Sequence, residues 1–280
     1  MLYYRYSLIL ILLIICLVCS KWNTITGSFH TYTNPSTKIK VVSFENEPLH
    51  THKRLLENKL TFYNYNYECI GTGLIWEGFG TKINEYKRYI RETTLRDNDI
   101  LILLDSRDVY VNRPSSELIK EFKKIYKQNG GDLDKNLKLL FSSEVGCCAD
   151  GLEDRYKQKM KEIGQNQHIS NEYYYLNSGM CIGYVKAFKQ IYLNINVKNT
   201  DDDQNEIIKY WLDGNEDKIC LDYNILFSNA VFWDQWNTLN GCEYYKKNDC
   251  FYFKHTNTKP FFIQTNGKYW KCYDFLYGIK

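Results

Sequence analysis

Two aspartates at the end of a continuous apolar run are the first sign of chemistry in this chain. In DILILLDSRDVYV (residues 99–111), Asp105 follows the apolar run directly and Asp108 comes three positions later. Two unpaired carboxylates held close together are costly, and Mg²⁺ or Mn²⁺ relieves that cost while sharing its coordination shell with substrate phosphates. The pattern therefore suggests a metal platform for a phosphorylated ligand. It also fits an ordinary strand-end turn in which an aspartate caps a helix or pairs with Arg107.

A second acidic cluster stands at the expected start of a helix. In NTDDDQNE (residues 199–206), Asp201, Asp202 and Asp203 follow one another. The helix dipole favours one or two acids at this end. Because three adjacent carboxylates repel one another, the third suggests a positively charged or hydroxyl-bearing partner.

Two polar turns interrupt apolar segments. YLNSG (residues 175–179) lies inside a buried-looking strand, where the backbone can approach a ligand closely. QTNGK (residues 264–268) ends a C-terminal strand with a turn dipeptide and a lysine, which also fits an ordinary β-turn.

The elements that must position these residues alternate between strand and helix through residue 144. The run before Asp105 is typical of a parallel strand covered on both faces, and ligands in open α/β sheets sit beyond the carboxyl ends of such strands. Apolar patterning predicts strands at 38–45, 65–73, 99–105 and 138–144, and helices at 49–64, 82–94 and 115–128.

The second half of the chain is less regular. The patterning predicts a strand at 173–185, a helix at 201–214, and short aromatic-rich strands at 219–229, 230–234, 250–255 and 261–266. No internal repeat or linker is evident. We therefore predict a single α/β domain over residues 38–280, with a mostly parallel mixed sheet flanked by helices and a more irregular C-terminal half.

The composition limits the classes of partner. The 280 residues carry 36 basic and 33 acidic side chains, a net charge of +3. This balance argues against nucleic acid as the main partner.

The N-terminus predicts entry into the secretory pathway. An apolar run at residues 8–19 lies between Arg5 and Lys21. It suits a signal-peptide core and is short for a membrane span, which needs about 20 residues. We expect a signal peptide or an uncleaved signal anchor at 1–20, a stem at 21–37, and a protein of the ER or Golgi lumen or a secreted one. Membrane attachment is expected only if the segment stays uncleaved.

The cysteines fit an oxidising compartment. An even number beyond the leader permits disulfide bonds without fixing their pairing. No Cys or His spacing resembles a zinc site, and His50 and His52, one residue apart, are weak candidates for ligation. The eight cysteines beyond the leader are Cys69, Cys147, Cys148, Cys181, Cys220, Cys242, Cys250 and Cys272.

In their order along the chain, these segments resemble the glycosyltransferase domain of the procollagen lysyl hydroxylase/glycosyltransferase family, a GT-A-like nucleotide-diphosphosugar transferase. The resemblance covers about residues 38–268, and its most specific blocks are YLNSGMCIGY and DDDQ. The other blocks are VVSFE, GLIWEG, GTK, ILLDSRDV, LLFSSEVGCCAD, KICLDYNILFSN and PFFIQTNGK.

The resemblance implies a donor site for a UDP-sugar. Asp105, Asp108 and the residue at position 264 would bind Mn²⁺, or Mg²⁺, which grips the diphosphate. The nucleotide would be bound by Val42, Trp76, Lys82, Arg107, Asn266, Gly267 and Lys268.

The resemblance also implies an acceptor side. Asn177 and the pair Asp202 and Asp203 would hold sugar hydroxyls or the acceptor, and one acid could assist deprotonation of the acceptor hydroxyl. Glu144 completes the catalytic candidates.

Two positions depart from the family pattern. Gln264 stands where the family has a metal-binding histidine, and an amide oxygen is a weaker ligand for Mn²⁺. Arg107 replaces an aromatic residue that packs on the nucleotide. The arginine could stack on uracil, pair with phosphate, or form a salt bridge with Asp108. No pattern for the family's hydroxylase module is seen, so hydroxylation is not expected.

Three functions follow as hypotheses. The first is a UDP-sugar-dependent hexosyltransferase that moves glucose or galactose to a hydroxyl, with hydroxylysine or galactosyl-hydroxylysine of collagen-like protein, or another protein or glycan, as acceptor. The second is a non-catalytic secreted domain that binds sugar or protein on a degenerate transferase fold, which Gln264 favours. The third and weakest is a phosphatase or phosphotransferase with Asp105 as nucleophile.

Overall fold

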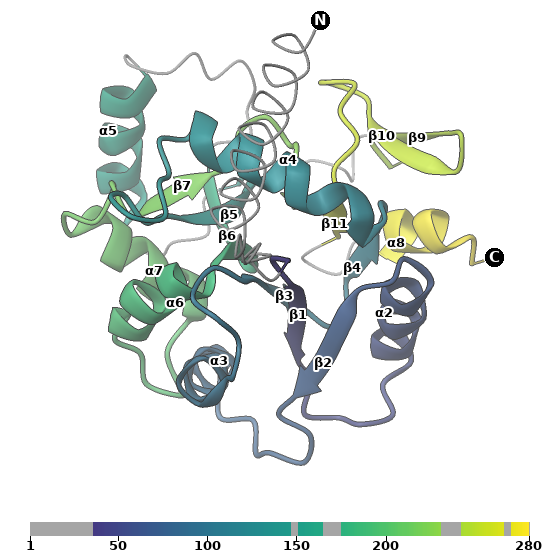
Figure 1. Cartoon of the computed structure of the whole chain (residues 1–280), viewed down its shortest axis with the longest axis horizontal. Helices are drawn as coiled ribbons and strands as arrows, with labels where there is room; N and C mark the ends of the chain where they lie inside the picture. Colours follow the sequence, from purple (N-terminus) through teal and green to yellow (C-terminus); the bar gives the residue numbers. More distant parts are fainter. Residues whose placement is uncertain (1–35, 147–150, 165–174, 231–241, 266–269, 280) are drawn as a thin grey trace, which may run out of the picture. The chain divides into compact units, whose positions relative to one another are not determined.

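A six-stranded sheet lies at the centre of the computed structural model, which describes residues 36–146, 151–164, 175–230, 242–265 and 270–279 (Figure 1). Residues 37–280 form one compact unit. In the order in which they pair, the strands are β2 (Asn66–Ile70), β1 (Ile39–Phe44), β3 (Ile100–Asp105), β6 (Tyr175–Tyr184), β5 (Leu139–Glu144) and β7 (Ile219–Leu221).

The sheet is mixed and mostly parallel, as predicted. Strand β1 pairs in parallel with β2 and β3, and β5 pairs in parallel with β7. Strand β6 alone is antiparallel to its neighbours β3 and β5. The carboxyl ends of β1 and β3 therefore meet at one edge, with Phe44 beside Asp105.

Helices cover both faces of the sheet, which explains why β3 is apolar without alternation. Leu101 and Leu103 belong to one buried cluster, whereas Ile100, Ile102 and Leu104 belong to another on the opposite face. The first cluster includes side chains of α3 (Phe79–Glu92), α5 (Glu153–Gly164), α6 (Val185–Gln190), the 3₁₀ turn η1 (Tyr192–Asn194) and α7 (Asp203–Leu212). The second includes α2 (Thr51–Phe62) and α4 (Ser115–Gln128).

The C-terminal half is irregular, also as predicted. It contributes two strands of a three-stranded sheet in the order β4 (Val109–Val111), β11 (Phe262–Gln264), β8 (Ser228–Ala230). A hairpin of β9 (Tyr244–Lys247) and β10 (Cys250–Phe253) and the helix α8 (Trp270–Tyr277) follow. A disulfide joins Cys242 to Cys272, so the expected disulfide chemistry is present.

Some sequence expectations differ in detail. The predicted strand 219–229 is split into β7 and β8, because the carboxylate of Asp222 turns the chain between them. Leu49, the first residue of the helix predicted at 49–64, precedes α2 and is 84% exposed. Most of the predicted strand 230–234 lies outside the described residues, as do Cys147, Cys148 and the N-terminal segment. Within the described part of the chain, no helix combines the length and apolarity that crossing a bilayer requires.

Asp222 stabilises the turn that leads into β8 of the three-stranded sheet, and this role can be tested. Its buried carboxylate accepts hydrogen bonds from the backbone N–H groups of Leu226, Phe227 and Ser228, at 3.1, 2.5 and 2.9 Å. In Asp222→Ala these buried donors lose their partner, so we expect the free energy of unfolding to fall by about 3 kcal/mol in urea titrations. The exposed control Asp217→Ala should stay within about 0.5 kcal/mol of wild type. Equal stabilities of the two variants would contradict this role.

Candidate functional site

Asp105 and Asp108 converge on one point at the carboxyl end of β3. The amide nitrogen of Gln264 donates to Asp105 Oδ2 at 2.9 Å and to Asp108 Oδ2 at 3.3 Å, so both carboxylates face a single atom. Gln264 reaches them because it ends β11, where it pairs with Val109 at the start of β4. The three predicted metal ligands therefore lie together.

Two oxygens of this trio are buried without a hydrogen-bond partner among the described residues, Asp108 Oδ1 and Gln264 Oε1. Burial, and then the charge of Asp105, raise the pKa of Asp108 to about 7. Burial also raises the pKa of Asp105, although Lys82 opposes the shift. Unpartnered oxygens and disfavoured negative charge are what a hard divalent cation relieves, so the residues fit such an ion.

The ligand set is unusual because its third member is an amide. Among the described residues no group of three or more His, Cys, Asp or Glu side chains could hold a metal. Gln264 would supply a third ligand oxygen if its side-chain amide flipped, because in the structure the amide nitrogen faces the carboxylates. Space for the amide comes from Gly179, where a Cβ would lie 2.2–2.3 Å from both amide heteroatoms. The predicted close approach of the backbone at the Asn-Ser-Gly turn is thus an approach to Gln264.

An irregularity in the sheet creates that approach. Phe141 of β5 pairs with Cys181 of β6, yet the next residue, Ser142, pairs with Asn177. The intervening residues of β6, including Ser178 and Gly179, have no opposite residue on β5. Such a bulge redirects side chains locally, and here it lies beside the site.

Arg107 turns away from the two aspartates. Its guanidinium donates to Glu45 from Nε at 2.8 Å and from Nη2 at 2.7 Å, and Nη2 lies 3.1 Å from Glu47. Ser106 also donates to Glu45, at 2.8 Å. Of the three sequence alternatives, the salt bridge with Asp108 is therefore not formed. The space between the aspartates is free of the arginine, whose side chain stays 40% exposed.

Lys82 joins the two acidic clusters of the sequence. Its ammonium nitrogen lies 2.6 Å from Asp105 Oδ1 and 2.8 Å from Asp203 Oδ2, and all three side chains are largely buried. Burial disfavours the charged lysine, but the two carboxylates outweigh this effect and raise its pKa above the ordinary value. Removing one partner of such a group leaves uncompensated buried charge, so the three residues act as a unit.

The adjacent acids of DDDQ have different environments. Asp203 is buried and accepts from Ser178 Oγ at 3.0 Å, in addition to its contact with Lys82. Asp202 is the exposed N-cap of α7, and one of its oxygens accepts from the backbone N–H of Asn205 at 2.8 Å. Only Asp202 of this pair is presented to an incoming molecule.

A buried amide network holds the acceptor-side candidates. Glu144, fully buried at the end of β5, accepts from Asn177 Nδ2 at 3.2 Å and from Gln204 Nε2 at 2.8 Å. Gln204 in turn accepts from the backbone N–H of Ser178 at 3.0 Å. Glu144 and Asn177 are therefore positioned inside the protein and fix the bulged strand relative to α7.

The remaining candidates lie at different depths. Val42 is fully buried in the core cluster that includes α3, so its place supports β1 and offers no exposed surface. Trp76 is 42% exposed, and its ring lies 5.7 Å from that of Phe44. Asn266, Gly267 and Lys268 lie outside the described residues.

Glu45 and Gln204 contact the candidate site residues, although the sequence patterns did not predict them there. Glu45 directly follows β1, at the same sheet edge as Asp105, and this placement was a usable signal. Gln204 stands in the quoted DDDQ block, but its contact with Glu144 joins residues 60 positions apart. Sequence spacing gives no signal for such a contact.

Known proteins that match this chain belong to the family that its sequence blocks resemble. The family model described as PLOD GT domain matches residues 35–276. The human multifunctional procollagen lysine hydroxylase and glycosyltransferase LH3 is 29% identical over 218 residues, which cover 74% of this chain and 26% of that protein. The Caenorhabditis elegans multifunctional procollagen lysine hydroxylase and glycosyltransferase is 26% identical over 244 residues, covering 82% and 30%. The matched part is thus less than a third of either relative.

Solved structures give weaker matches. Mouse xyloside xylosyltransferase 1 aligns with a TM-score of 0.47 at 10% identity, covering 82% of this chain and 98% of that chain. A glycosyltransferase involved in the glycosylation of the major capsid of PBCV-1 aligns with a TM-score of 0.44 at 13% identity, covering 81% and 93%.

The amide ligand predicts a metal preference. An all-oxygen set suits Mg²⁺ and Mn²⁺ alike, whereas imidazole favours the later transition metals. We expect Gln264→His to tighten Mn²⁺ binding about tenfold relative to Mg²⁺, measured by the electron paramagnetic resonance signal of free Mn²⁺ with Mg²⁺ as competitor. Gln128→His, which adds an imidazole to the exposed end of α4, should leave the ratio unchanged. An unaltered ratio in Gln264→His would exclude position 264 as a ligand.

Proposed function

The chain belongs to the PLOD GT domain family, and from this premise we propose that it is a metal-dependent glycosyltransferase that moves glucose or galactose from a UDP-sugar to a hydroxyl group. The observation that carries the proposal is the convergence of Asp105, Asp108 and Gln264, with two buried oxygens lacking a hydrogen-bond partner among the described residues. A nucleotide diphosphate and its cation would complete this site at the carboxyl end of β3.

Binding of the UDP-sugar donor would depend on a divalent cation that pairs with its diphosphate. Asp105, Asp108 and the amide oxygen of Gln264 would hold the cation, which when bound supplies the Lewis-acid charge that stabilises a departing diphosphate. Arg107 and Trp76 are partly exposed and are the described residues available to the nucleotide. Residues 266–268 are expected to close over the diphosphate.

Lys82 takes a positioning role in this proposal. Its ammonium is engaged by Asp105 and Asp203 and is nearly inaccessible, with 9% of the side chain exposed. It therefore orients one ligand carboxylate and, through Asp203, the first turn of α7. Two of the three N–H donors of its ammonium are engaged by these partners, so a direct contact with phosphate or ribose would use the third.

On the acceptor side, Asp202 is the favoured proton acceptor. As the acceptor hydroxyl oxygen bonds to the anomeric carbon, the bond from that carbon to the diphosphate oxygen breaks, and the hydroxyl proton passes to a carboxylate. Asp202 is exposed at the first turn of α7, where its carboxylate accepts from the backbone N–H of Asn205. Asp203, Glu144 and Asn177 hold the surrounding structure in place.

The acceptor and the compartment are inferred from the relatives' names. Because those proteins are procollagen lysine hydroxylases and glycosyltransferases, we take hydroxylysine or galactosyl-hydroxylysine of a collagen-like chain as the acceptor to test first. The N-terminal apolar run and the disulfide between Cys242 and Cys272 support the lumen of the secretory pathway as the compartment in which the protein acts.

A second function rests on the contacts that the two aspartates already make. Lys82 donates to Asp105, and the amide of Gln264 donates to both aspartates. A protein that used these donors permanently would bind a sugar or a polypeptide without metal and without catalysis.

Titration calorimetry with UDP separates the two functions. We expect UDP to bind at least about tenfold more tightly with Mn²⁺ than with EDTA, because the cation bridges the carboxylates and the diphosphate. Asp105→Asn should lose this difference, whereas Asp97→Asn, in the exposed loop before β3, should retain it. UDP or sugar binding that ignores Mn²⁺ would favour the non-catalytic function, and UDP release from UDP-glucose or UDP-galactose with a collagen-like peptide would exclude it.

Asp202→Asn tests the proton acceptor without disturbing the fold. Asn caps a helix about as well as Asp, so the melting temperature should not change. The turnover rate should fall about 10²-fold or more because an amide cannot take the proton, while UDP affinity with Mn²⁺ stays at the wild-type value. Asp201→Asn is the matched control, since the Asp201 side chain accepts a local bond from the Lys198 N–H. Wild-type turnover in Asp202→Asn would assign the proton to another group.

A further inference from the structure

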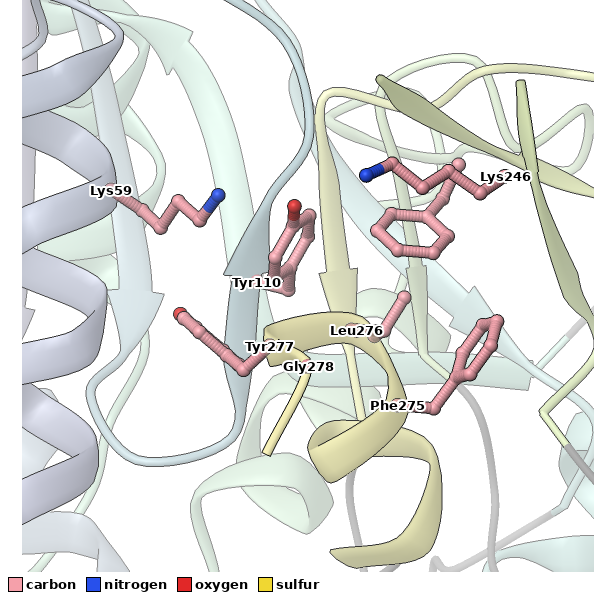
Figure 2. A pocket seen from close by; sticks show the side chains of 8 residues that line it. Lys59, Tyr110, Lys246, Phe275, Leu276, Tyr277 and Gly278 are labelled. Carbon is pink, nitrogen blue, oxygen red and sulfur yellow. The ribbon is translucent and has the colours of Figure 1, made fainter. Parts of the chain in front are cut away.

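A cavity lies between α2, β4, the β9–β10 hairpin and α8 (Figure 2). Its volume is about 320 Å³, at the lower end of the range for sites that bind small molecules. The residues that line it are Lys59, Tyr110, Lys246, Phe251, Phe275, Leu276, Tyr277 and Gly278.

The walls of the cavity are aromatic and fixed. The ring of Tyr110 meets those of Phe251 and Tyr277 edge to face, with centroids 5.4 and 4.9 Å apart, and Phe251 meets Phe275 at 5.5 Å. Tyr277 donates its hydroxyl to the carbonyl oxygen of Val109 at 2.9 Å, which anchors α8 to β4. These contacts form an apolar wall on one side of the cavity, against which a flat group can pack.

Two ammonium groups point into the opening from opposite sides. Figure 2 shows the side-chain nitrogens of Lys59 and Lys246 directed toward each other across the hydroxyl end of Tyr110. Lys59 Nζ lies 5.1 Å from the centroid of the Tyr110 ring, and Lys59 has no acidic partner among the described residues. None of the eight residues that line the cavity is acidic.

The positive charge at the opening is poorly compensated. Burial and the charge of Lys246 both lower the pKa of Lys59. The nearest acid to Lys246 is Asp249, at 3.4 Å, but this pair is 57% and 96% exposed and so contributes little. An anion between the two lysines would relieve their repulsion and pair with both.

We propose that this cavity binds a small aromatic acid, a single ring that carries a carboxylate, sulfate or phosphate group. The acid would lie between Lys59 and Lys246, and the ring would pack against the wall formed by Phe251, Tyr110 and Phe275. A sugar acid fits less well, because apart from the two lysines and the tyrosine hydroxyls the lining offers no side-chain hydrogen-bonding group for ring hydroxyls.

The site is separate from the one formed by Asp105 and Asp108. Tyr110 belongs to the third buried cluster, together with Phe251 and Leu276, and none of the residues around the two aspartates lines this cavity. The proposal therefore holds or fails independently of glycosyltransferase activity.

Titration calorimetry with phenyl phosphate, phenyl sulfate and benzoate tests the proposal on the full protein in EDTA, which prevents a metal from recruiting phosphate to Asp105 and Asp108. We expect at least one of the three acids to bind, and phenol and inorganic phosphate to bind at least tenfold more weakly. Lys59→Met and Lys246→Met should each weaken binding at least fivefold. Lys247→Met, on the same strand outside the cavity, should leave binding unchanged, and thermal unfolding checks that all three variants fold.

Four results would overturn the proposal. The first is that none of the three acids binds, and the second is that phenol binds as well as the acids. The third is that inorganic phosphate binds as well as the acids, and the fourth is that Lys247→Met weakens binding as much as Lys246→Met. The second and third results remove the need for the charge and for the ring, respectively.

Discussion

The candidate site depends on holding two largely buried carboxylates close together. Asp105 and Asp108 share the amide nitrogen of Gln264, and Asp105 is also bound by Lys82. These donors hold the carboxylates together but leave Asp108 Oδ1 and Gln264 Oε1 without hydrogen-bond partners among the described residues. These two oxygens are the atoms that a cation would bind in the proposed function.

The architecture around the site follows from this constraint. The carboxylates must come from a strand end with rigid support, and β3 is buried on both faces by separate clusters. Gln264 must approach from the other direction, which the antiparallel pairing of β11 with β4 provides. Its amide needs room, and the bulge in β6 places Gly179 there. Each irregularity near the site thus serves the position of one side chain.

Those features that depend on local patterning could be predicted from the sequence. The apolar run before Asp105 indicated a covered strand, and the strand–helix alternation indicated a mostly parallel sheet; both are present. The DDDQ cluster indicated a helix start, but not that Asp202 would cap it while Asp203 would turn inward to Lys82. Arg107 shows the limit most clearly. Its partner is Glu45, 62 residues away, and only the pairing of β1 with β3 brings the two together.

Lys82 connects the donor and acceptor halves of the proposed reaction. One ammonium group holds a ligand carboxylate at the end of β3 and Asp203 in the first turn of α7, and Asp202 is the next residue along the chain. The distance from the diphosphate site to the exposed carboxylate is thus set by a short chain of buried, charge-assisted contacts. Glu144 and Gln204 tie the same helix to β5 and β6. Because two independent links fix α7 to the sheet, the separation between Asp105 and Asp202, the proposed metal ligand and proton acceptor, is set by the folded core.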